Sequence, residues 1–315
     1  VQLLPSQREF FVEGSDTLLD AALRAGLALN YGCSNGNCGL CKARVISGQV
    51  KRVRNHDYVV SEAEKGAGVV LMCSNTAVTD LVIEAEEAGS AQEIPLQQIA
   101  ARVKKVEPLT DDLILLHLQT PRTRRLRFLA GQYVTLQAAD APPFDYPVAS
   151  CPCDDRNLQF HVQRQSGNPF ADLVFQGLKT GDTVNMLGPR GEFVLREDSP
   201  RTGVFIAWDT GIAPIKSLIE HAMALDVADS LHLYWFALPG HGHYVGNLFR
   251  AWSDALDNFH FTPVEVPMAA GTDPARLRAE LARVTHDHPL LRDCDVYVSG
   301  TPALLDAARE LLLAQ

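Results

Sequence analysis

The sequence contains no apolar run of the roughly 18 residues that a membrane-spanning helix requires. Its first residues, VQLLPSQREFFVEG, lack the basic segment and the apolar core of a secretory signal. We therefore expect a cytoplasmic protein without a membrane partner.

Basic residues are in the minority, with 28 lysines and arginines against 38 aspartates and glutamates and a net charge of −10. Contact with nucleic-acid phosphates needs a basic face, so this balance excludes nucleic acid as an expected partner. An acidic surface suits a basic protein partner, but it is equally common among ordinary cytosolic proteins.

Cysteines are few and odd in number: there are seven, and three of them fall within nine residues. A disulfide framework would need an even set at regular spacing. The crowding predicts a metal site in a reducing compartment instead.

The crowded cysteines are Cys33, Cys38 and Cys41, in the spacing Cys-x4-Cys-x2-Cys, and Cys73 follows far downstream. This spacing is typical of a plant-type [2Fe–2S] cluster, whose two irons take four thiolates. The alternatives are a zinc site or buried cysteines. Structural zinc sites use paired Cys-x2-4-Cys hooks, whereas three of these cysteines share one loop, so we favour the cluster.

The remaining cysteines and the histidines carry weaker signals. Cys151 and Cys153 flank a proline too tightly for a common metal hook, and we expect them to have a core or strand-end role. Cys294 stands alone near a predicted strand start, and we expect it to be buried. Histidines cluster at 241–243 and 286–288, where a metal site or exposed loops are the alternatives, and exposed loops are favoured.

The hydrophobic pattern changes twice along the chain, which predicts an iron–sulfur domain at 1–88, a linker at 89–98 and further domains at 99–200 and 201–315. Residues 99–200 alternate apolar and polar side chains between Gly- and Pro-containing turns, the pattern of an antiparallel β-barrel. Residues 201–315 alternate short apolar strands with helices, the pattern of a doubly wound parallel α/β sheet. The expected fold class is therefore multi-domain, α+β followed by α/β.

Longer stretches such as FLAGQYV, LKTGDTVNMLGPRGEF and DVYVSGTPALLDAAR resemble the ferredoxin-reductase-type [2Fe–2S] flavoproteins, and the resemblance covers nearly the whole chain. It implies a β-grasp ferredoxin domain, a flavin-binding barrel and an NAD(P)-binding domain. It also implies a reaction in which NAD(P)H reduces FAD and single electrons pass to the cluster. The final acceptor would be an oxygenase, a dehydratase or a ferredoxin.

The resemblance also implies the nucleotide contacts. Those of the flavin would be Phe144, Tyr146, Pro147, His161, Val162, Gln163, Gly167, Asn168, Phe170 and Ala171, and those of the pyridine nucleotide Thr210 and Gly211. Several depart from the family pattern: Phe144 replaces a phosphate-binding arginine, Pro147 a serine and Ala171 a hydroxyl residue. Arginine is favoured there because its guanidinium group is charged and can donate two hydrogen bonds to one phosphate, which phenylalanine cannot do.

The pyridine-nucleotide loop departs further, since Trp208 and Asp209 stand where the family has two glycines. A carboxylate near the approaching phosphates repels them by about 1 kcal/mol or more. The segment Phe236–Leu238 also lacks the cation that relatives place there. These changes predict weak direct oxidation of NAD(P)H.

We therefore expect a [2Fe–2S] electron-transfer protein that passes single electrons between a flavin and a protein partner. It would be an NAD(P)H-dependent reductase only if the altered nucleotide sites still work. The alternatives are a non-catalytic electron carrier, a redox sensor or a regulatory subunit on the same scaffold.

Overall fold

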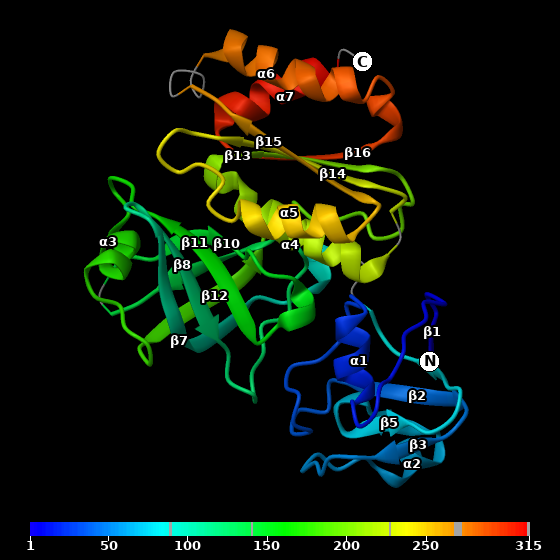
Figure 1. Ribbon diagram of the computed structural model, residues 1–315. Coiled ribbons are helices and arrows are strands. Elements are labelled where there is room, and N and C mark those ends of the chain that lie inside the picture. Colours follow the sequence, from blue (N-terminus) through cyan, green and yellow to red (C-terminus); the bar gives the residue numbers. More distant parts are fainter. Residues whose placement is uncertain (88–89, 140, 227, 268–272, 314–315) are drawn as a thin grey trace.

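The computed structural model describes residues 1–87, 90–139, 141–226, 228–267 and 273–313 (Figure 1). Its three larger sheets follow one another along the chain, and each has its own hydrophobic core. In the described residues, no helix has the length and apolarity to cross a membrane.

The first part, blue to cyan in Figure 1, contains a four-stranded mixed sheet and a two-stranded sheet. Its elements are β1 (Gln2–Leu4), α1 (Leu18–Arg24), β2 (Lys42–Ser47), β3 (Val50–Arg52), α2 (Glu62–Gly66), β4 (Val69–Leu71), β5 (Asn75–Ala77) and β6 (Val82–Glu84). The larger sheet has the order β1-β6-β2-β4, and β3 pairs with β5. Thr17 caps α1 by accepting the backbone N–H of Asp20, so the helix begins with its leucines facing the core.

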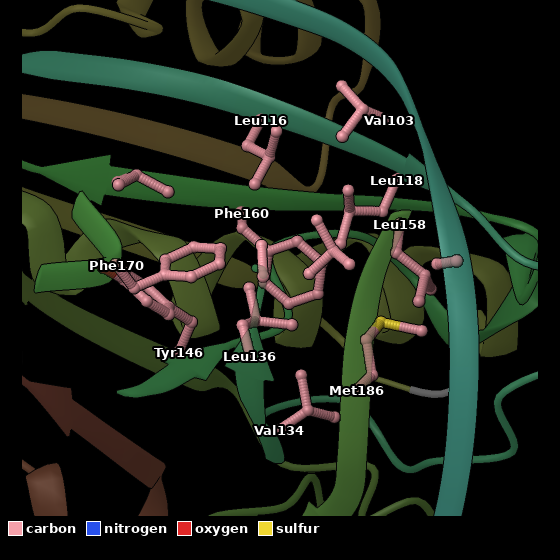
Figure 2. Close-up of a cluster of buried hydrophobic side chains, with 14 of the residues drawn as sticks. Val103, Leu116, Leu118, Val134, Leu136, Tyr146, Leu158, Phe160, Phe170 and Met186 are labelled. Carbon is pink, nitrogen blue, oxygen red and sulfur yellow. The ribbon is translucent and has the colours of Figure 1, made fainter. Parts of the chain in front are cut away.

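The second part is a six-stranded antiparallel sheet in the order β10-β9-β12-β7-β8-β11. Its strands are β7 (Gln97–Thr110), β8 (Leu113–Gln119), β9 (Tyr133–Gln137), β10 (Phe144–Pro147), β11 (Asn157–Gln163) and β12 (Thr183–Arg190). The end strands β10 and β11 contact each other, which nearly closes the sheet into a barrel. Alternate side chains such as Leu116, Leu136 and Phe160 fill its interior (Figure 2). Helix α3 (Pro169–Gln176) adds Phe170 to this core.

The third part is a parallel sheet in the order β15-β14-β13-β16, made of β13 (Gly203–Trp208), β14 (Leu231–Ala237), β15 (Phe259–Glu265) and β16 (Asp295–Ser299). Helices α4 (Ile212–Leu225) and α5 (Gly246–Ala255) cover one face, and α6 (Pro274–Asp287) and α7 (Pro302–Leu313) cover the other (Figure 1). β13 lies in the middle of the sheet and is buried along its whole length, as the apolar run Gly203–Trp208 requires.

The predicted fold class is confirmed: a small α+β part, an antiparallel barrel and a doubly wound α/β part follow in the expected order. The stretch predicted as a linker holds a short 3₁₀ turn, Ala91–Glu93, and the first residues of β7. The domain limits themselves stay predictions.

Candidate functional site

Four cysteine sulfurs gather at the edge of the first part. Cys33, Cys38 and Cys41 lie on the loop between α1 and β2, and Cys73 lies on a 3₁₀ turn after β4. Cys41 Sγ is 3.1 Å from Cys73 Sγ, and the backbone N–H of Cys38 donates to Cys33 Sγ across 3.4 Å. The ligand residues therefore lie as two neighbouring pairs, Cys33 with Cys38 and Cys41 with Cys73.

Two glycines let the loop wrap tightly around these sulfurs. Gly36 and Gly39 have φ values of +82° and +74°, which only glycine adopts without strain. A Cβ at Gly36 would stand 2.3 Å from that of His56, and a Cβ at Gly39 would stand 2.2 Å from the Tyr58 ring. The backbone is thus held against its neighbours, with its N–H groups free to face sulfur.

The surroundings favour thiolates at one sulfur of each pair. Burial raises the pKa of Cys33, but backbone N–H groups of Asn35 and Cys38 outweigh it and the net shift is downward. The hydrogen bond from Cys41 lowers the pKa of Cys73 to about 6. Burial keeps water from Cys33, Cys41 and Cys73, while Cys38 is half-exposed.

This arrangement fits a two-iron cluster. Such a cluster takes four thiolates, two on each iron, and the two sulfur pairs match that need. Among the residues that the structure describes, no group of three or more His, Cys, Asp or Glu side chains surrounds a single-ion position. The donor set therefore fits [2Fe–2S] better than one zinc ion.

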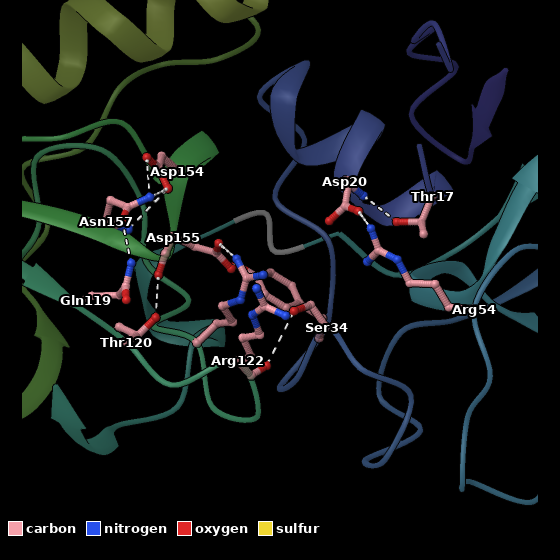
Figure 3. A network of polar contacts seen from close by, with 12 residues as sticks. Thr17, Asp20, Ser34, Arg54, Gln119, Thr120, Arg122, Asp154, Asp155 and Asn157 are labelled. Atoms are coloured by element: carbon pink, nitrogen blue, oxygen red, sulfur yellow. Dashed lines mark hydrogen bonds and ion pairs between the residues drawn. The ribbon is translucent and has the colours of Figure 1, made fainter. Parts of the chain in front are cut away.

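A buried polar contact joins the cluster loop to the barrel (Figure 3). The Tyr31 hydroxyl donates to Asp155 across 2.6 Å, and Arg125 forms an ion pair with the same carboxylate. Ser34, beside Cys33, donates to the backbone oxygen of Arg122. Burial raises the pKa of both Tyr31 and Asp155, the latter against the opposing effect of Arg125.

Cys151 and Cys153 form a disulfide at the 3₁₀ turn Pro152–Asp154, which was not predicted from the sequence, although Cys151 is buried as a core role requires. The odd cysteine count hid this pair, because the free Cys294 makes the total odd. Cys294 was expected to be buried, and that expectation was wrong, because its side chain is partly exposed.

A second feature is a cleft of about 360 Å³ between the barrel and the carboxyl ends of the parallel strands. Eight of the predicted nucleotide contacts line it: Phe144, Tyr146, Pro147, His161, Gln163, Asn168, Thr210 and Gly211. Four others do not: Val162, Phe170 and Ala171 are fully buried in the barrel core, and Gly167 lies in the exposed turn before α3. The roles of all twelve stay predictions.

Trp208 and Asp209, expected in the pyridine-nucleotide loop, line the cleft, and so do Asp145 and Ser299, which were not among the predicted contacts. Trp208 and Ser299 are the last residues of β13 and β16, Asp209 follows β13, and Asp145 lies on β10. Position 211 requires glycine, because a Cβ there would stand 2.5 Å from the Ser299 carbonyl oxygen.

The side chain of Asn168 caps the N-terminus of α3. Asn168 accepts the backbone N–H of Ala171 at its side-chain oxygen and donates to the Tyr146 hydroxyl across 2.7 Å. Pro169 has no N–H to offer. Burial raises the pKa of Tyr146 to about 12, so its hydroxyl stays protonated.

At the lining residue Asp209, one histidine bridges two carboxylates. His241 Nδ1 lies 2.7 Å from Asp209 and His241 Nε2 lies 2.8 Å from Asp112. Burial lowers the pKa of His241, but the two carboxylates outweigh it and the net shift is upward. His241 was expected to be an exposed loop residue, and that expectation was wrong, because the bridge leaves only 11% of its side chain accessible.

His161 is one of two buried residues lining the cleft in which a ring nitrogen has no hydrogen-bond partner in the described chain, the other being Trp208 at Nε1. The residue is 6% exposed, its Nδ1 lies 2.9 Å from the Tyr244 hydroxyl, and its Nε2 has no hydrogen-bond partner. Burial lowers the pKa of His161 to about 3, so the ring is neutral.

Protein-family models match three successive stretches of the chain. Residues 1–78 match the 2Fe-2S iron-sulfur cluster binding domain, residues 100–195 the oxidoreductase FAD-binding domain, and residues 205–310 the oxidoreductase NAD-binding domain. The chain is thus similar to an iron–sulfur, a flavin-type and a nucleotide-type domain in that order.

Curated relatives and solved structures agree with this order. The chain is 31% identical over 312 residues to the CDP-6-deoxy-L-threo-D-glycero-4-hexulose-3-dehydrase reductase of Yersinia pestis, covering 98% of this chain and 92% of that protein. It is 30% identical to the propane 2-monooxygenase reductase component of Rhodococcus jostii, covering 98% and 86%. The crystal structure of the Amycolatopsis cytochrome P450 reductase GcoB superposes with a TM-score of 0.59 at 26% identity, covering 99% and 94%.

Proposed function

Because this chain belongs to the ferredoxin-reductase-type [2Fe–2S] flavoproteins, we propose that it passes single electrons between a flavin and a redox protein partner. The observation that carries the proposal is the pairing of Cys33 with Cys38 and of Cys41 with Cys73 on a tightly wrapped loop. When bound, the cluster supplies a one-electron step; the thiolates hold it and the surrounding N–H groups stabilise their charge.

The partner that we propose is an oxygenase, a dehydratase or a ferredoxin in the cytoplasm. Relatives named as reductase components serve a hexulose dehydrase and a propane monooxygenase, which supports this choice. Cys38 is the half-exposed ligand, and Leu40 beside it is 50% exposed. An electron would leave at this edge, where the partner approaches most closely.

The Tyr31–Asp155 hydrogen bond supports transfer between the barrel and the cluster. Tyr31 lies two residues before the ligand Cys33, and Asp155 lies between the barrel strands β10 and β11. Arg125 holds the carboxylate from the barrel side. These residues position the cluster loop on the barrel, so that the distance between the cleft and the cluster stays fixed.

The cleft fits a flavin only in part. Phe144, Tyr146 and Trp208 provide aromatic surface for a ring. The phosphate side does not fit, since no lysine or arginine is found among the described lining residues. We therefore derive no step through FAD or NAD(P)H, and we expect direct NAD(P)H oxidation to be slow.

Restoring the missing phosphate and ring contacts tests this interpretation. We expect Phe144→Arg with Pro147→Ser to bind FAD about tenfold or more tightly than the unaltered chain, because a charge-assisted hydrogen bond contributes roughly 1.5–3 kcal/mol. Quenching of flavin fluorescence measures the affinity. Val78→Arg adds the same charge at an exposed site of the first part and should change nothing. Equal affinities in all three proteins would refute the assignment of these positions.

Asp209 gives a second test. Its φ is +50°, a region that glycine prefers, and it lines the cleft with its carboxylate paired to His241. Asp209→Gly should tighten NADH binding about fivefold by removing a like charge. Asp112→Asn is the control, because it also weakens the bridge to His241 without altering the loop of Asp209. Calorimetric titration that finds no gain in the glycine variant would count against charge repulsion as the obstacle.

A further inference from the structure

We propose that the cleft selects an aromatic ring ligand without phosphate, represented by riboflavin, over the phosphate-bearing FMN and FAD. This rests on the proposed electron-transfer function, and it names the ligand class of the same cleft. The selection follows from the charges, the backbone N–H groups and the aromatic surface of the lining residues.

The charges of the lining residues are negative. Asp145 and Asp209 line the cleft, and none of the described lining residues is a lysine or an arginine. The residues outside the described ranges contain no lysine or arginine in the sequence either. A phosphate entering this space meets two carboxylates and no lysine or arginine among the described lining residues, and at close range an unpaired carboxylate repels it by about 1 kcal/mol. The positive groups beside these carboxylates are already paired with them, His241 directly with Asp209 and Arg190 through Thr135 with Asp145.

One arginine linked to a lining residue, Arg190, already donates a hydrogen bond. Arg190 donates to the Thr135 hydroxyl across 2.9 Å, and the same hydroxyl donates to Asp145 across 2.6 Å. The guanidinium and the carboxylate thus share one hydroxyl, and the Asp145 charge offsets that of Arg190 for any approaching anion.

Two other basic residues, Arg164 and Lys216, already have partners of their own. Arg164, next to the lining residue Gln163, places its guanidinium 4.2 Å from the centre of the Phe175 ring. Lys216 lies close enough to His161 to contribute to its lowered pKa, but it is 5% exposed and pairs with Glu220 across 2.6 Å. Neither is free to hold a phosphate in the cleft.

The N-terminus of α3, which could bind a phosphate, also has few free N–H groups. A helix N-terminus binds anions through its first unpaired N–H groups. In α3, Pro169 has no N–H, and the N–H of Ala171 is taken by Asn168. That of Asp172 goes to the backbone oxygen of Asn168, and Asp172 adds a negative charge to the first turn. Only the N–H of Phe170 is left.

The aromatic residues that line the cleft suit an aromatic ring ligand. The ring centres of Phe144 and Tyr146, both on β10, lie 5.7 Å apart, and Trp208 also lines the cleft. His161, another lining residue, is 6% exposed, and neither its Nε2 nor Nε1 of Trp208 has a hydrogen-bond partner among the described residues. A buried ring nitrogen without a partner costs about 1–3 kcal/mol, which a ligand carbonyl or imide N–H would recover. At about 360 Å³ the cleft lies at the small end of ligand pockets, roughly 300–1,000 Å³.

The test is a titration of the flavin-free, cluster-loaded full chain with riboflavin, FMN and FAD, each followed by quenching of flavin fluorescence. We expect riboflavin to bind at least about fivefold more tightly than FAD, with FMN also weaker than riboflavin. The difference should shrink at high salt, because ions screen the repulsion. FAD binding as tightly as riboflavin, or more tightly, would overturn the proposal, as would failure of all three to bind.

Two exposed carboxylates provide matched variants. Asp145→Asn should tighten FMN and FAD binding about fivefold while leaving riboflavin unchanged, whereas Asp254→Asn on α5 should change neither. Equal gains for riboflavin and FAD in the first variant would contradict charge selection.

Transfer from the reduced bound flavin to the cluster is a separate readout. Riboflavin that binds selectively but leaves the cluster oxidised would refute the proposed electron transfer from a flavin and would still support the ligand selection. The two proposals therefore fail on different measurements.

Discussion

The purified Cys41→Ser variant is expected to lack most of the iron and nearly all of the visible absorption of the unaltered protein. Cys41 is 1% exposed and its sulfur lies 3.1 Å from that of Cys73, so its loss breaks one of the two ligand pairs. A serine hydroxyl is a harder ligand with a much higher pKa and holds iron poorly. Iron and sulfide analysis, with the visible spectrum, measures the loss.

Cys294→Ser is the matched control, because Cys294 is a free cysteine outside the cluster loop. That variant should retain full iron content. A Cys41→Ser protein with an unchanged iron content and spectrum would show that this sulfur is not a ligand.

The Asp155→Ala variant should be less stable by about 3–5 kcal/mol, since removing one partner of a buried ion pair leaves an uncompensated charge. Asp155 is 3% exposed, and its loss would leave both Arg125 and the Tyr31 hydroxyl without their shared acceptor. Urea unfolding of the cluster-loaded protein, followed by circular dichroism, measures the change in free energy of unfolding.

Asp154→Ala provides the neighbouring comparison. Asp154 accepts hydrogen bonds from Asn157 at an exposed position, so the expected loss is about 1 kcal/mol. Equal losses in the two variants would show that the Tyr31–Asp155–Arg125 contact does not hold the cluster loop to the barrel.

The cluster cysteines and the fold class were predictable because each depends on residues close together in the sequence or on a regular pattern. Spacing alone grouped Cys33, Cys38 and Cys41, and the period of the apolar residues separated barrel from α/β sheet. β7 is long, from Gln97 to Thr110, because it pairs with β12 over one half and with β8 over the other.

Contacts between distant segments were not predictable. Asp112 and Asp209 reach His241 from two different parts of the chain, and no local pattern joins them. The Tyr31–Asp155 bond spans 124 positions. Such contacts are decided by how the barrel packs on its neighbours, which sequence periodicity does not record.

The start of α3 shows a subtler limit. Asn168 is a good N-cap residue and Pro169 suits the first position of a helix, and α3 begins there. The same two residues consume or remove the N–H groups that a phosphate would need, so a surviving helix start is not a surviving phosphate site. Only the hydrogen-bond partners of Ala171 and Asp172 reveal that difference.

An anaerobic dithionite titration of the cluster-loaded chain, followed by visible and electron paramagnetic resonance spectra and then by addition of cytochrome c as a one-electron acceptor, tests the central claim most directly. The account predicts uptake of one electron per chain at the four cysteines, a paramagnetic reduced state, and its loss as cytochrome c is reduced. A chain that takes up no electron at the cluster, or holds it without passing it on, would contradict the account.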